Sequence, residues 1–218
     1  MITEGVAGRR ARRQQGNVVS AYTQLGSVPI AYMEGEGDEG TRTGMRMQLS
    51  ALGATGIAPV QAVPTTAAQW LIVNPAANTK SAYIDELGMI LVSGTGGANA
   101  TVLCAVLPPA NMPATVPSAS AANIVITNRS TSSGNTSRLI VASAQTLVGV
   151  TAGWWYPLAW EDIANTLLGQ TQLVDRDIRG KIEIAPGGGV ALAVISPTGT
   201  TPLWGPVGTW REYESDNE

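Results

Sequence analysis

Short apolar runs separated by turns fill the chain from about residue 66 to its end. The runs AQWLIV, TVLCAVL and KIEIA are each followed by a segment rich in Pro, Gly or Asn. Apolar runs of this length with turn residues at their ends predict β-strands. Because the strands do not alternate with helices, the pattern favours an all-β sandwich or barrel over an α/β fold. Residues 157–170, PLAWEDIANTLLGQ, are the exception and predict one or two helical turns.

The longest run, residues 81–94, does not alternate cleanly between polar and apolar positions. Neither face of a continuous strand would be purely apolar, so we predict that Gly88 marks a β-bulge that switches the register. Asp85 and Glu86 occupy adjacent positions and are predicted to point to opposite faces, so they would not form one cluster. We expect Lys80 to pair with one of these acids at the surface, and the alternative is a ligand site.

Charge is scarce in this chain. Asp, Glu, Lys and Arg make up 13% of the residues, against about 25% in an average soluble domain, which predicts that much of the surface faces other subunits. There is no His, and the single cysteine, Cys104, lies inside an apolar run. Because the commonest general base and transition-metal ligand is missing, we expect no enzymatic activity, no cofactor and no metal. No segment has the pattern of a signal peptide or a membrane span, so we expect no membrane association.

The composition changes near residue 65, and we predict an extended N-terminal arm at residues 1–65 followed by one β-sandwich domain at residues 66–218. Four arginines form a block near the start of the arm: Arg9, Arg10, Arg12 and Arg13. Such a block contacts nucleic acid, another polyanion or a protein shell, and the alternative is a solvated terminus without a partner. GEGDEG, at residues 35–40, matches a dinucleotide-binding spacing, but its acids would repel a pyrophosphate. We interpret it as a solvated acidic turn, with a loose cation site as the alternative.

Two clusters are candidates for binding. The first joins aromatic and acidic side chains: Trp154, Trp155, Tyr156, Trp160, Glu161 and Asp162. The rings would stack on sugars while the acids accept hydroxyl hydrogen bonds, or the same rings fill the core or a subunit interface. Because the chain has no Phe, we expect Trp to supply the bulk of the core. The second cluster is predicted to pair charges between subunits, with Ca²⁺ binding as the alternative: Asp175, Arg176, Asp177 and Arg179.

The segments WLIVNPAANTKSAYIDELGMILVSG and KIEIAPGGGVALAVI, with the terminal GTWREYE, resemble tailed-bacteriophage virion proteins built on a jelly-roll β-sandwich. In that group an NP turn precedes a long strand and a PG turn precedes the penultimate strand. The resemblance covers roughly residues 66–215. It implies a non-enzymatic virion component, with a decoration, cement, head-fibre or attachment role. Such a component is often trimeric and contacts copies of itself and other virion proteins such as the major capsid protein. The alternative function is a carbohydrate- or receptor-binding module that uses the aromatic cluster.

Overall fold

The computed structural model describes residues 45–94, 100–131, 133–161, 173–196 and 202–214. Ten strands and two single-turn 3-10 helices occur within these residues. The strands are β1 (Arg46–Ser50), β2 (Ala67–Val73), β3 (Lys80–Ser93), β4 (Ala100–Leu107), β5 (Val125–Asn128), β6 (Ile140–Thr146), β7 (Tyr156–Glu161), β8 (Leu173–Ile184), β9 (Gly189–Ile195) and β10 (Leu203–Glu214). The 3-10 helices are η1 (Pro109–Asn111) and η2 (Ala152–Trp154). Among the described residues, no helix has the length and apolar character needed to span a membrane.

The chain divides into two compact units, Met1–Arg46 with Asn128–Asn135, and Met47–Thr127 with Thr136–Glu218. In the described part of the first unit, the Arg129 backbone N–H donates to the Arg46 carbonyl oxygen at 2.9 Å. The second unit holds both β-sheets, apart from the terminal residues of β1 and β5.

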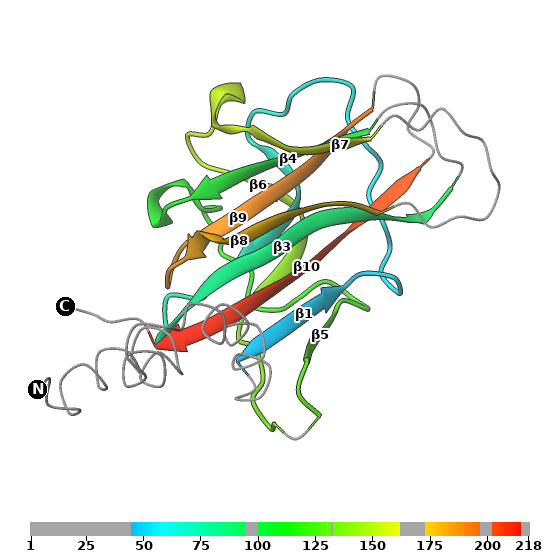
Figure 1. Ribbon diagram of the computed structural model, residues 1–218. Coiled ribbons are helices and arrows are strands. Elements are labelled where there is room, and N and C mark those ends of the chain that lie inside the picture. Colours follow the sequence, from blue (N-terminus) through cyan, green and yellow to red (C-terminus); the bar gives the residue numbers. More distant parts are fainter. Residues whose placement is uncertain (1–44, 95–99, 132, 162–172, 197–201, 215–218) are drawn as a thin grey trace, which may run out of the picture. The chain divides into compact units, whose positions relative to one another are not determined.

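Each sheet has five strands, in the order β5-β1-β10-β3-β8 in sheet A and β6-β2-β9-β4-β7 in sheet B (Figure 1). β3 runs antiparallel to β10 along its whole length and to β8 on its other side, and β9 lies antiparallel between β2 and β4. When β5 and β6 are set aside, the remaining orders β1-β10-β3-β8 and β2-β9-β4-β7 are those of a jelly roll. The predicted all-β, jelly-roll-like antiparallel sandwich is therefore confirmed. β5 and β6 are an insertion that adds one strand to an edge of each sheet.

Tryptophan fills the space between the two sheets. Trp70, Trp204 and Trp210 are fully buried in one core cluster with Leu, Ile, Val and Met side chains from both sheets. The Trp70 indole Nε1 donates to the Trp204 carbonyl oxygen at 2.9 Å and so links sheet B to sheet A. In this chain without Phe, tryptophans are the largest fully buried side chains of the core, and Leu, Ile, Val, Met and Ala fill the rest of it.

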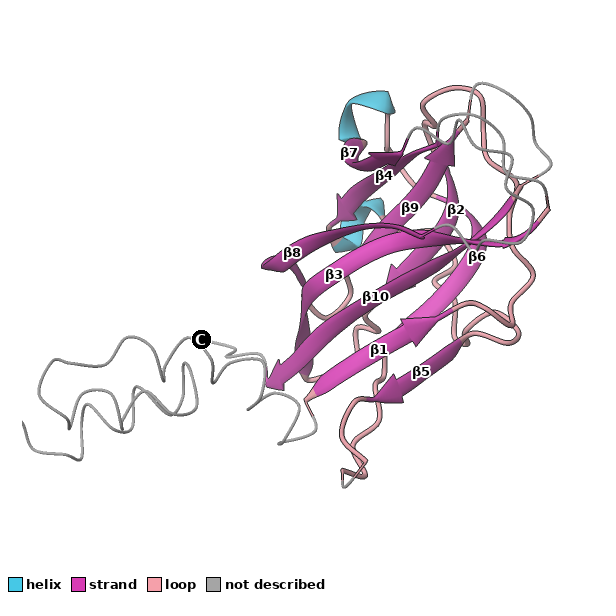
Figure 2. Cartoon of the chain, turned by 45° about the vertical axis from the view of Figure 1, so that its right-hand side comes forward, coloured by secondary structure: helices cyan, strands magenta, loops and turns pink. Residues whose placement is uncertain are grey.

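A second core covers the outer face of sheet B. Leu71 and Leu103, from β2 and β4, are buried there together with Met112 and Trp155 from the segments that follow η1 and η2. Sheet B is thus buried on both faces, which explains why β2 and β9 have continuous apolar sequences instead of an alternating pattern. Figure 2 shows η1 and η2, in cyan, at the end of sheet B where β4 finishes and β7 starts.

β3 contains the predicted register switch, but at another residue. Its pairing with β10 skips one residue between Ile84 and Glu86, and its pairing with β8 shifts register at the same place, where residues 178–181 of β8 have no partner in β3. The bulge is therefore at Asp85, and the prediction of Gly88 is wrong. Ile84 faces the core before the bulge and Leu87 faces it afterwards, so Asp85 and Glu86 lie on the same outer face of sheet A. The prediction that they point to opposite faces is also wrong, because it assumed unbroken alternation.

The predicted helical turns do not form at the start of residues 157–170. Tyr156–Glu161 is strand β7, which pairs antiparallel with β4 at the edge of sheet B. Pro157 lacks a backbone N–H, and an edge strand tolerates this because its outer side needs no partner. The rest of the segment, residues 162–170, lies outside the described residues.

The sandwich begins earlier than residue 66. β1 lies between β5 and β10 and is the first strand of the jelly roll, and its Met47 and Leu49 are buried in the core. Ile57 exchanges backbone hydrogen bonds with Trp204, each 2.9 Å long. The boundary predicted at residue 65 is therefore too late, because short apolar patches in this stretch belong to the sandwich. Residues 1–44 lie outside the described residues, and the arm stays a prediction for them.

Candidate functional site

The predicted binding residues fall partly outside the described part of the chain. Those outside are Arg9, Arg10, Arg12, Arg13, residues 35–40 and Asp162. Trp160 and Glu161 lie at the end of β7, where their backbone pairs with β4. Asp175 and Arg176 lie in β8, where their backbone pairs with β3. The roles predicted for these residues stay predictions.

The aromatic cluster is divided between the interior and the surface. Trp155 is 7% exposed, packs in the second core, and donates its indole Nε1 to the Thr65 carbonyl oxygen at 3.0 Å. Its neighbours Trp154 and Tyr156 are 38% and 57% exposed. The backbone at Trp155 is extended, so neighbouring side chains point to opposite sides. Trp155 fills a core and is not accessible to a sugar, whereas Trp154 and Tyr156 are.

In β8, Asp177 and Arg179 bind each other within one chain. The Arg179 Nε donates to Asp177 Oδ2 at 2.6 Å, and both side chains are exposed. This hydrogen bond and the charge of Asp177 raise the pKa of Arg179 above its ordinary value, so the guanidinium stays charged. Among the residues that the structure describes, no group of three or more His, Cys, Asp or Glu side chains is placed to hold a metal ion.

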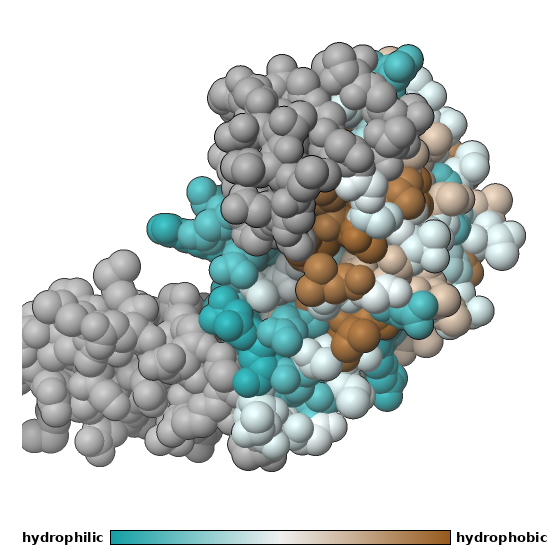
Figure 3. Space-filling view, turned by 90° about the vertical axis from the view of Figure 1, so that its right-hand side faces the viewer, coloured by the Kyte–Doolittle hydropathy of each residue, from teal (hydrophilic) through white to brown (hydrophobic). Residues whose placement is uncertain are grey.

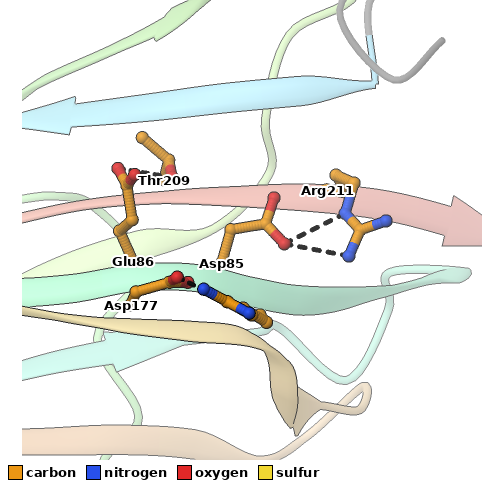
Figure 4. A network of polar contacts seen from close by, with 6 residues as sticks. Asp85, Glu86, Asp177, Thr209 and Arg211 are labelled. Atoms are coloured by element: carbon orange, nitrogen blue, oxygen red, sulfur yellow. Dashed lines mark hydrogen bonds and ion pairs between the residues drawn. The ribbon is translucent and has the colours of Figure 1, made fainter. Parts of the chain in front are cut away.

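A polar network joins β3 to β10 on the outer face of sheet A (Figure 4). The Asp85 carboxylate accepts hydrogen bonds from Nη2 (2.9 Å) and Nε (3.1 Å) of Arg211, and the two side chains are 13% and 15% exposed. The Glu86 carboxylate accepts from the Thr209 hydroxyl at 3.1 Å. The sequence predicted that Lys80 pairs with Asp85 or Glu86. Asp85 instead pairs with Arg211 of the neighbouring strand. The network binds strand to strand, which is a structural role.

Asn74, in the NPAAN segment, is a fully buried connection that sequence reasoning missed. Its Nδ2 donates to the carbonyl oxygens of Lys80 and Ile184, both at 2.8 Å, and its Oδ1 accepts from Nδ2 of Asn78 at 2.7 Å. Its backbone N–H donates to the Gly188 carbonyl oxygen at 2.9 Å. Asn74 thus joins the NP turn to the end of β8 through its side chain and to the PG turn through its backbone. The two turn motifs that carry the sequence resemblance serve the fold.

Two other buried polar side chains, Gln69 and Glu212, also connect separate segments of the sandwich through hydrogen bonds. Gln69 donates from Nε2 to the Ala58 carbonyl oxygen and accepts the Val194 N–H at Oε1, both at 2.6 Å. Glu212 accepts hydrogen bonds from the Trp210 indole, at 2.9 Å, and from the Ser137 hydroxyl. These polar groups have their partners inside the protein, so they stabilise the sandwich and do not form a binding cleft.

Exposed apolar side chains gather where β4 ends and β7 begins. Tyr156 pairs with Cys104 of β4, so Val106, two residues further on, is its diagonal neighbour on the same face. Trp154, the last residue of η2, lies two residues before Tyr156 in the chain. Val148 is held nearby, because its backbone N–H and carbonyl bond with the Asn111 carbonyl (3.3 Å) and side-chain amide (2.8 Å) in η1, which follows β4. We call Val106, Val148, Trp154 and Tyr156 the aromatic end of sheet B.

Charge is distributed unevenly between the sheets. β2, β4, β6 and β9 contain no Asp, Glu, Lys or Arg, whereas β3, β8 and β10 of sheet A contain several. In the side view of Figure 3, strongly hydrophilic surface gathers on one part of the described residues, and apolar and weakly polar surface covers much of the rest. The signal is present in the sequence, where four long stretches lack charge: residues 47–79, 87–128, 139–160 and 184–210. The total charge content does not show this; the positions of the charged residues along the chain do.

Comparison with known proteins finds no family model, no curated protein and no solved structure that matches the chain. The functional interpretation therefore rests on the residues of the chain itself. Among the residues that the structure describes, the aromatic end of sheet B is the surface best suited to bind a partner.

Proposed function

We propose that the chain is a non-enzymatic structural subunit of a virus particle, where it assembles with copies of itself and with other virion proteins such as the major capsid protein. One observation carries this proposal: four of the eight large apolar side chains that the described surface exposes gather at the aromatic end, in stretches of the chain that contain no charged residue. Surfaces without charge are poorly suited to permanent contact with water, and the centres of protein interfaces are depleted in charge. The jelly-roll fold and the resemblance to tailed-phage virion proteins agree with this role.

Self-assembly is tested by the mass of the purified full-length chain in solution. We expect a trimer or a larger closed ring by light scattering, at both low and high salt. Contacts between uncharged surfaces are not screened by ions, so added salt should not dissociate the assembly. A monomer at every protein concentration would refute the self-assembling subunit.

The predicted arm completes the proposal as the anchor to the particle. Its block of four arginines would bind a shell protein or packaged nucleic acid, and assembly would repay the entropy of ordering the arm. Deleting residues 1–40 removes none of the described strands, so we expect the truncated chain to fold and to lose binding to particles. A full-length variant with all four arginines changed to Gln separates charge from length. Binding of the truncated chain at the level of the full chain would refute the anchor.

A second candidate function is carbohydrate or receptor binding. The observation in its favour is the exposure of Trp154 and Tyr156, whose rings are accessible for stacking. We expect a glycan-binding chain to lose affinity when Trp154 or Tyr156 is replaced with Ala. Screening the full-length chain on a glycan array tests the candidate directly, and the absence of any bound glycan would argue against it.

A further inference from the structure

No further inference is drawn: the strongest candidate, the cluster of exposed apolar and aromatic side chains at the aromatic end of sheet B, carries none because nothing in the described part of the structure shows what covers it.

Discussion

Replacing Asn74 with Ala should cost the sandwich a large part of its stability. The change removes hydrogen bonds to Lys80, Ile184 and Asn78 from a fully buried side chain. The Ile184 carbonyl and the Asn78 amide are buried. Leaving each of them without a hydrogen-bond partner lowers the stability of the protein by about 1–3 kcal/mol. The Lys80 carbonyl is only partly buried, and water replaces its partner at low cost. The expected loss is therefore about 2–6 kcal/mol, from a total that is typically about 5–15 kcal/mol.

Guanidinium unfolding followed by tryptophan fluorescence measures this loss, because three of the tryptophans are fully buried. Asn111→Ala is the control, since the Asn111 side chain donates an exposed hydrogen bond to the Val148 carbonyl oxygen at 2.8 Å, and the loss of this bond should cost about 0.5–1.5 kcal/mol. Asn74→Asp keeps the shape but points carboxylate oxygens at two carbonyls, so it should destabilise at least as much as Asn74→Ala. If Asn74→Ala costs no more than Asn111→Ala, the turn-joining role is refuted.

Three further changes test other parts of the structure by the same unfolding assay. Arg211→Met leaves the mostly buried Asp85 carboxylate without its two donors and should cost about 1–3 kcal/mol; an unchanged midpoint would mean that water replaces the arginine. Gly189→Ala would place a Cβ 2.7 Å from a backbone carbonyl oxygen of β2, and such overpacking should cost about 1–3 kcal/mol of stability. Gly153→Ala is the control: its Cβ would lie at least 3.9 Å from every described atom outside the adjacent residues, so the change should be neutral. Trp155→Ala should cost about 3–5 kcal/mol because its ring fills the second core, and a stability near that of the parent would show that the ring is not packed there.

The strands of the core were predictable because their apolar runs are long enough to be read locally. β2, β4 and β9 coincide with AQWLIV, TVLCAVL and the run after PGGG. β7 was not predictable in this way, because its few apolar positions also fit a helical period. Pairing with β4, about fifty residues earlier in the chain, decides its structure. Tertiary pairing overrides local preference in such short segments.

The bulge in β3 shows the limit of reading a strand by itself. The broken alternation indicated a register switch, and glycine was the obvious candidate for its place. At the actual position, the Asp85 carboxylate accepts hydrogen bonds from Arg211 of β10, which lies 126 residues away in the chain. Asn74 and Ile184 are similarly separated by 110 residues. No local pattern identifies partners at such distances, so the stabilising network could not be found from the sequence.

The residues that hold the fold together are different from those proposed to bind a partner. Asn74, Gln69 and Arg211 have their hydrogen bonds inside one chain, while Val106 and Val148 expose nearly half of their surface. Substitutions in the first group should therefore lower stability in monomers and oligomers alike. Substitutions in the second group should weaken the binding of a partner while leaving the thermal stability of the unbound chain near that of the parent. Because the two effects are separable, binding and stability measured on the same variants distinguish a lost interface from a damaged sandwich.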